Sequence, residues 1–202
     1  MGSTGTYPRF QGSHKNGLRH GPAVVTYNDG SCYQGPYEEN HKQGRGIYTM
    51  ASGATYEGQF DHGKFHGWGI FRWSNGEEFI GQWNNGLQHG WGIQTWPDGQ
   101  RYVGRWVNGA REGFGEHRFN SGGCYRGQWK NNLRHGFVYY TFPDGDVSYG
   151  LWRDGKIYHH FESVDQADSY KDDMTDRKPV PVVPGWIKSR VLEKMGGENG
   201  LS

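Results

Sequence analysis

The chain has 202 residues, among them 35 Gly, 13 Tyr, 10 Phe and 9 Trp, and its formal net charge at pH 7 is +1. A charge this close to zero excludes self-repulsion as a cause of disorder and argues against nucleic acid or an anionic membrane as the main partner. No stretch approaches the ~18 apolar residues of a membrane-spanning helix, and no secretory signal is evident, so a cytoplasmic protein is expected.

The N-terminus, residues 1–9, is expected to be an extension ahead of the first repeat. Met1-Gly2-Ser3-Thr4-Gly5-Thr6 satisfies the loose pattern for N-myristoylation. The pattern is short and common, so the sequence leaves open whether Gly2 carries the lipid or the end is unmodified and flexible.

A repeat of 23 residues runs from residue 10 to about residue 156 without an insertion. An aromatic residue opens each repeat, a glycine follows two positions later, and a second ring comes two positions after that glycine. Another glycine stands further along each repeat. We interpret both glycine series as structural; their central members are Gly58, Gly81, Gly104 and Gly127 in the first series and Gly67, Gly90 and Gly113 in the second.

Each repeat is predicted to be a β-hairpin. In residues 56–60, rings and glycine alternate with polar residues, which predicts a strand with one apolar and one wet face. Asn75-Gly76 predicts a tight hairpin turn, because both residues tolerate positive φ. A glycine at a strand centre indicates that a ring from the neighbouring repeat lies across it. Together these patterns predict an all-β fold, an elongated single-layer antiparallel sheet of consecutive hairpins.

The ring-bearing face of such a sheet is a candidate protein-interaction surface, because a single layer cannot bury that face fully by itself. Tryptophan is frequent among the hot-spot residues that contribute most of the binding energy of an interface. The alternative is that the rings only stack on one another. The candidate residues are Trp73, Trp83, Trp96, Trp106 and Trp129.

Residue types associated with chemistry are present, but their spacing does not favour a reactive site. Four histidines share one repeat position, so neighbours should lie about 10 Å apart, whereas zinc needs nitrogens within ~2.1 Å of one ion. Cys32 and Cys124 are four repeats apart, which predicts free thiols. We therefore expect no catalytic residue, no cofactor and no metal site. The histidines in question are His20, His66, His89 and His135.

The tail is predicted to contain one helix. Residues 157–184 have the composition of an acidic and proline-rich linker, and residues 197–202 that of a flexible end. Residues 185–196 have the spacing of a short amphipathic helix, which is marginal in water alone and should therefore dock. The sequence leaves open whether it docks on this chain or on a partner. Its candidate contact residues are Trp186, Ile187, Val191, Leu192 and Met195.

The pattern Tyr-x-Gly-x-Trp-x-x-Gly-x-x-His-Gly-x-Gly, nearly complete from Phe79 to Gly92, resembles the MORN repeat (membrane occupation and recognition nexus). The resemblance covers about residues 10–155. The tail, with Val182-Val183-Pro184-Gly185-Trp186 ahead of the short helix, is similar to the segment that follows the repeats in the MORN-containing radial spoke head proteins of motile cilia.

The resemblance implies a non-enzymatic scaffold that binds other protein subunits of a large assembly, as a homo- or hetero-oligomer. The implied location is the cytoskeleton, in the radial spoke head of the ciliary or flagellar axoneme. The alternative is a phospholipid-binding module that tethers membranes. Attachment to an anionic membrane needs a clustered basic patch, and no such cluster is evident in the sequence, which argues against the membrane alternative.

Overall fold

The computed structural model describes residues 8–168 and 181–196, which belong to two compact units, Met1–Leu87 and Gln88–Ser202. We refer to them as the N-terminal unit and the C-terminal unit. The myristoylation pattern, the middle of the expected linker and the expected flexible end lie outside the described residues.

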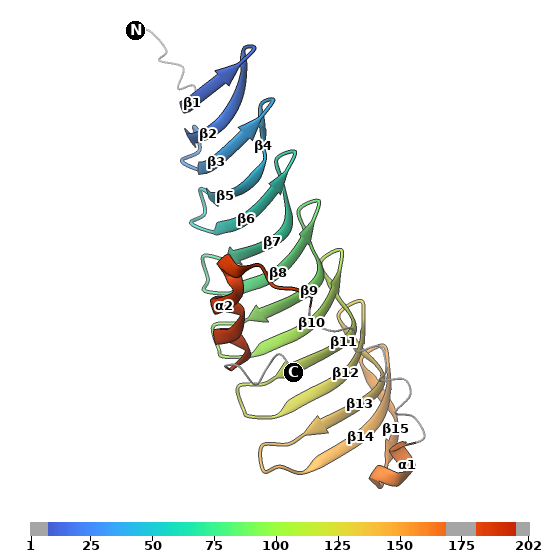
Figure 1. Cartoon of the computed structure of the whole chain (residues 1–202). Helices are drawn as coiled ribbons and strands as arrows, with labels where there is room; N and C mark the ends of the chain where they lie inside the picture. The colour runs from blue at the N-terminus through green and yellow to red at the C-terminus, as the bar shows by residue number, and fades with distance from the viewer. Residues whose placement is uncertain (1–7, 169–180, 197–202) are drawn as a thin grey trace. The chain divides into compact units, whose positions relative to one another are not determined.

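The N-terminal unit is a single layer of antiparallel strands that pair in chain order (Figure 1). The two-residue strand His41–Lys42 is the exception, since it pairs with the preceding strand and lies off the main path of the sheet. In β6 (Thr55–Asp61), Tyr56, Gly58 and Phe60 lie on one face and are buried, and the polar residues between them are more exposed, as the period of two predicts. The strands are β1 (Arg9–Lys15), β2 (Leu18–Thr26), β3 (Cys32–Glu38), β4 (His41–Lys42), β5 (Gly44–Thr49), β6 (Thr55–Asp61), β7 (Lys64–Arg72) and β8 (Glu78–Asn84).

The C-terminal unit has the same single-layer architecture and carries two helices. Its strands are β9 (Leu87–Thr95), β10 (Arg101–Val107), β11 (Ala110–Arg118), β12 (Cys124–Lys130), β13 (Leu133–Thr141), β14 (Val147–Arg153) and β15 (Lys156–Phe161). The helices are α1 (Val164–Asp168) and α2 (Gly185–Met195). α2 ends at Gly196, whose left-handed φ of 88° lets its N–H reach the carbonyls of the last turn. The predicted all-β fold of consecutive antiparallel hairpins, followed by a short C-terminal helix, is confirmed.

The strands continue beyond the expected end of the repeat array. β15 and α1 occupy residues for which the sequence predicted linker from residue 157 onward. β15 pairs with β14, and its Phe161 packs against Phe137 and against Ala167 of α1. The sequence did not reveal β15 because its residues lack the glycines that mark the second strand of the other repeats.

The tight turns lie at a different place from the one predicted. Asn85-Gly86 connects β8 to β9 with φ values of 50° and 86°, as a two-residue type I′ turn requires. At Asn75-Gly76 only the glycine has positive φ, and the Gly76 N–H donates to the Trp73 carbonyl at 3.1 Å. The Asn75 side chain accepts a hydrogen bond from the Glu77 N–H at 3.0 Å. This connection is therefore a longer Asx-stabilised loop, and the prediction of a tight turn there was wrong.

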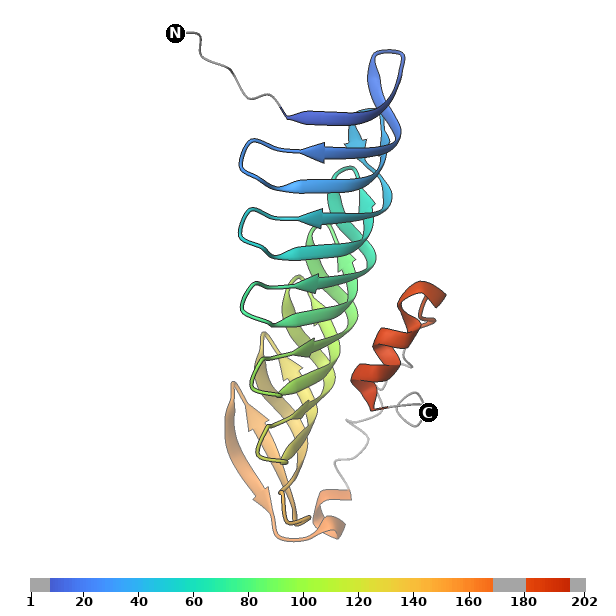
Figure 2. The ribbon, with the colours of Figure 1, turned by 90° about the vertical axis from the view of Figure 1, so that its left-hand side faces the viewer.

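A β-bulge bends most hairpins. In β6 and β7 the register shifts between Gly58 and Gln59, and Gly67 on the partner strand has a φ of +55°. Gly90 and Gly113 hold the same repeat position with φ values of 76° and 70°. Bulges bend a strand locally, and Figure 2 shows the resulting curvature of the strands in each unit.

The strand-centre glycines leave room for a tyrosine ring. A Cβ atom on Gly58 would lie 2.5 Å from the Tyr56 hydroxyl oxygen and 2.6 Å from the Gly69 Cα. The Tyr56 hydroxyl donates to the Gln59 carbonyl at 2.8 Å, which fixes the ring in this position. In the same way, a Cβ atom on Gly104 would lie 2.5 Å from the Tyr102 hydroxyl oxygen. The ring comes from the same repeat as the glycine, so the expectation of a ring from the neighbouring repeat was wrong.

We expect Gly58→Ala to lower the melting temperature, because either the Tyr56 ring or the Gly69 backbone must move. Overpacking of this kind costs about 1–3 kcal/mol. Gly185→Ala is the matched control, since a Cβ at Gly185 meets nothing within 4 Å. Thermal unfolding of both variants checks the prediction, and equal melting temperatures would contradict it.

Candidate interaction surfaces

The face that carries Tyr56 and Phe60, which we call the ring face, holds a ladder of edge-to-face ring contacts. Tyr56 meets Phe60 of its own repeat at 5.2 Å and Trp83 of the next repeat at 5.5 Å between ring centroids. In the C-terminal unit, Tyr102 meets Trp106 at 5.4 Å and Trp129 at 5.3 Å. Such pairs each contribute about 0.5–1.5 kcal/mol beyond their burial.

Cationic side chains cover this ladder. The Arg111 guanidinium lies 4.2 Å from the Trp129 ring centroid and 5.4 Å from that of Tyr102. The Lys42 ammonium lies 3.8 Å from the Tyr48 centroid, and burial lowers the pKa of Lys42. Cation–π contacts of this type are worth about 0.5–2 kcal/mol. This series was not predicted from the sequence, although its members stand 23 residues apart or at multiples of 23: Arg19, Lys42, Arg111 and Arg134.

The ring face is therefore mostly closed by the chain's own side chains. Trp83, Trp106 and Trp129 are buried in the ladder, so the expectation that they lie uncovered was wrong. Trp73 and Trp96 are half-buried. A role for any of these five residues in partner binding stays a prediction. For the three buried ones, the alternative of mutual stacking agrees better with the contacts.

The opposite side of the layer, which we call the reverse face, receives the helices. Ala167 of α1 is fully buried against Phe137 and Phe161, with Tyr149 and Leu151 beside them. These residues lie on β13, β14 and β15. The reverse face of the C-terminal unit thus offers an apolar surface on which a helix packs.

α2 also docks on the reverse face of the C-terminal unit. Arg101 alternates with Tyr102 along β10 and so points to the reverse face, where its Nη1 donates to the backbone carbonyl of Lys194. Ile187 and Val191 are fully buried. The other predicted contact residues, Trp186, Leu192 and Met195, are half-buried. The sequence left the docking site open, and the structure places the helix on this chain.

A charged cluster holds Arg101 in position. The Glu116 carboxylate contacts Arg118 Nε and Arg126 Nε, each at 2.6 Å, and Arg101 Nη2 at 3.7 Å. Burial would raise the pKa of Glu116, but hydrogen bonds and charge from Arg126 and Arg118 outweigh burial and hold that pKa below its usual range. Three guanidinium groups around one carboxylate leave excess positive charge beside the C-terminal end of α2, where a helix dipole favours cations. This basic group was not predicted from the sequence.

We expect Arg101→Gln to loosen α2, because the helix loses the charged donor at its last turn and an 11-residue helix is marginal alone. Hydrogen exchange of the α2 amides should become faster while the exchange of the strands stays unchanged. Arg118→Gln removes the same charge from the cluster and serves as the control, because the Arg118 guanidinium pairs with Glu116, whereas that of Arg101 donates to the α2 backbone. Equal protection of α2 in the two variants would contradict the docking role of Arg101.

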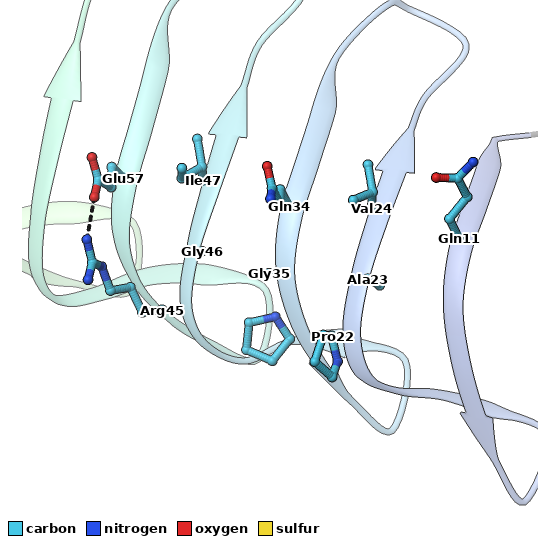
Figure 3. A pocket seen from close by; sticks show the side chains of 11 residues that line it. Gln11, Pro22, Ala23, Val24, Gln34, Gly35, Arg45, Gly46, Ile47 and Glu57 are labelled. Atoms are coloured by element: carbon cyan, nitrogen blue, oxygen red, sulfur yellow. Dashed lines mark hydrogen bonds and ion pairs between the residues drawn. The ribbon is translucent and has the colours of Figure 1, made fainter.

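On the reverse face of the N-terminal unit there is an open pocket of about 540 Å³ (Figure 3). Its side chains form a row across five strands, because successive pairs are in register between β1, β2, β3, β5 and β6. Ile47 and Val24 are the exposed apolar members of this row, with 43% and 37% of their surface accessible. The row consists of Gln11, Val24, Gln34, Ile47 and Glu57.

The described residues contain no group of three or more metal-ligating side chains. Cys32 and Cys124 are free thiols, as predicted, and burial raises the pKa of Cys124. Within the same residues, no helix has the length and apolar character needed to cross a membrane.

The consecutive hairpins, the ring ladder and the helix-binding reverse face define a β-repeat protein built as a structural or binding module. The MORN repeat family model matches residues 10–32, 33–55, 56–78, 79–101, 102–124 and 125–147. The chain therefore belongs to the MORN repeat family, as the sequence pattern predicted.

Among curated proteins, none matches the chain. Two similar solved structures come from Drosophila melanogaster. One is the TCP domain of SAS-4 (dCPAP) in complex with a proline-rich motif of Ana2 (dSTIL), with 13% identity, coverage of 80% of this chain and 95% of that chain, and a TM-score of 0.43. The other is the TCP10c domain of Sas-4, with 12% identity, coverage of 77% and 100%, and a TM-score of 0.41. Similarity at this level does not inform the function.

Proposed function

We propose that the chain is a non-enzymatic scaffold subunit that holds other proteins through the reverse face of its sheet. The observation that carries this proposal is the contrast between the two faces. The ring face is closed by its own ladder and by cations such as Arg111, whereas the reverse face binds two helices and keeps an open pocket. A sheet face that combines exposed apolar side chains, such as Val24 and Ile47, with an open pocket is suited to binding other protein segments.

More specifically, we propose a place in the radial spoke head of motile cilia or flagella, within the axonemal cytoskeleton. The support is the resemblance of the repeats together with the tail around Pro184-Gly185-Trp186 to MORN-containing radial spoke head proteins. The partners would be other spoke-head subunits, in a homo- or hetero-oligomeric assembly.

The test is a pull-down from ciliated cells with the full chain as bait, read by mass spectrometry. Axonemal spoke-head proteins should be enriched over a bait of equal size and charge. If the chain enriches other soluble protein assemblies, the scaffold role stands and the radial spoke assignment fails. If it captures no protein reproducibly, the scaffold proposal fails.

A phospholipid-binding module is the rival function, and the Arg101–Arg118–Arg126 group is the feature that favours it. That group is partly neutralised by Glu116, and its Arg101 is engaged by α2. We therefore expect the chain to stay in the supernatant when sedimented with liposomes, with and without phosphoinositides. Co-sedimentation that depends on phosphoinositides would support the rival.

A further inference from the structure

One repeat position on the reverse face carries a large ring in some repeats and lacks it in others. In the third repeat this position is Trp68, which is buried. In the first two repeats it is Pro22 and Arg45. Strand pairing establishes the equivalence, because each of these residues faces the same position of the next strand: Pro22 faces Pro36, Arg45 faces Gln59 and Trp68 faces Gln82.

The C-terminal unit follows the ring-bearing pattern. Trp91, Phe114 and Phe137 hold the position there, each opposite the equivalent residue of the next strand. Phe137 is fully buried and packs with Ala167 of α1. A ring at this position is therefore the normal filling of the reverse face, and the first two repeats are the exceptions.

The open pocket lies where the two rings are missing. Pro22 and Arg45 themselves line it, together with the exposed Val24 and Ile47 (Figure 3). Beneath them, Gly35 and Gly46 leave only backbone facing this side, since a Cβ on either would point at the Tyr33 ring on the ring face. Its volume of about 540 Å³ falls within the range of roughly 300–1,000 Å³ typical of ligand pockets.

The polar groups of the pocket favour an uncharged guest. Arg45 Nη2 and Glu57 Oε1 form an ion pair at 2.5 Å, so the two charges of the lining cancel. Gln11 and Gln34 add amide groups that can donate to or accept from a peptide backbone. A polyanion gains no net attraction from such a lining, whereas an apolar ring with a neutral backbone finds both apolar walls and amide partners.

We propose that this pocket binds an aromatic side chain, Trp or Phe, presented by an uncharged segment of a partner protein. The guest ring takes the place that Trp68 occupies in the third repeat. Aromatic residues that enter pockets are frequent anchors of protein interfaces. This inference rests on the proposed scaffold function and adds the chemistry of one contact.

The first test titrates the full chain with N-acetyl-L-tryptophanamide and follows the methyl resonances of Val24 and Ile47 by NMR. We expect saturable shifts at these methyls with a dissociation constant in the range of about 0.1–10 mM, as expected for a guest of this size. N-acetylglycinamide, which lacks the ring, should cause none. Absence of saturation, or equal shifts with both probes, would overturn the proposal.

Arg45→Trp is the decisive variant, because it supplies the missing ring from within the chain. We expect it to raise the melting temperature of the chain and to weaken tryptophanamide binding at least tenfold. Glu57 then loses its partner, but it lies at the surface and stays solvated. Arg45→Gln removes the same ion pair but keeps the space for the guest ring open. Because the probe is uncharged, we expect this variant to weaken probe binding far less than Arg45→Trp. Unchanged binding in Arg45→Trp would overturn the proposal.

The same variant separates this inference from the scaffold function. In the pull-down, Arg45→Trp should lose at least one partner that the unaltered chain and Arg45→Gln both retain. If all three baits capture the same partners, the pocket proposal fails and the scaffold function stands. If the unaltered chain binds tryptophanamide but captures no protein, the scaffold function fails and the pocket lacks its proposed protein guest.

Discussion

Truncation of Trp129 to Ala is expected to lower the free energy of unfolding of the chain by about 3–5 kcal/mol, the usual cost of removing a buried large ring. Trp129 is only 4% exposed and meets Tyr102 at 5.3 Å and Tyr125 at 5.0 Å between ring centroids. Arg111 covers its face at 4.2 Å. One substitution therefore removes these two ring contacts, a third with His117 at 6.1 Å, one cation–π contact and the hydrogen bond from Trp129 Nε1 to the Gly115 carbonyl.

Phe142→Ala is the control for this prediction. Phe142 is an exposed ring, with 42% of its surface accessible, and it touches Tyr140 at 4.7 Å. Urea unfolding followed by circular dichroism should show a loss several times larger for Trp129→Ala than for Phe142→Ala. Losses of equal size would mean that the ladder does not carry the stability of the C-terminal unit.

The fold could be predicted from the sequence because the signal is repeated in phase. Alternation around Tyr56 sets the strands, and the 23-residue period repeats the same hairpin. The boundaries were predicted less well, since β15 contains neither of the periodic glycines. The turn was misplaced because Asn-Gly pairs occur at both ends of a hairpin, at Asn75-Gly76 and Asn85-Gly86, and only the second pair has positive φ at both residues.

Which face would be covered could not be predicted, because the covering side chains differ in type from repeat to repeat. Lys42 and Arg111 place a cation on a ring, whereas Phe65 stacks on Tyr56 at 3.8 Å. A cation and an aromatic ring are dissimilar in sequence but cover a ring face equally well. The series of covering side chains is therefore not evident from a shared residue type.

The basic cluster and the pocket depend on strand register, which the sequence pattern does not supply. Arg101 faces Arg118, and Glu116 faces Arg126, across neighbouring strand pairs. The pocket arises because Pro22 and Arg45 stand at the repeat position where the later repeats carry an aromatic ring. Both features become visible only when residues 10 to 17 positions apart are brought onto adjacent strands.

Acidification is expected to destabilise the C-terminal unit through His117, whose pKa is lowered to about 4. The largest cause is burial, and the positive charges of Arg111 and Arg134 act in the same direction, while Asp98 opposes them. The neutral ring stacks on Trp96 at 5.4 Å and on Phe119 at 4.5 Å, and its Nε2 lies 3.2 Å from Gln100 Oε1.

The direction of the effect follows from the two pKa values of His117. The unfolded chain takes up a proton near the ordinary value of 6.5, whereas the folded chain does so only near 4. The stabilisation from His117 is therefore complete above pH 6.5 and is lost as the pH falls from 6.5 to 4. The loss amounts to about 3 kcal/mol, because each pKa unit corresponds to about 1.4 kcal/mol.

Replacement of His117 by residues that other repeats carry at this position isolates the effect. Phe71 and Gln94 are these equivalents, so His117→Phe and His117→Gln should keep the packing while removing the proton site. Between pH 6.5 and 4 the unfolding free energy of both variants should fall by about 3 kcal/mol less than that of the unaltered chain. Other titrating groups contribute equally to all three proteins and cancel in the difference. Parallel pH profiles in urea unfolding would show that His117 takes up its proton at the same pH in the folded and the unfolded chain.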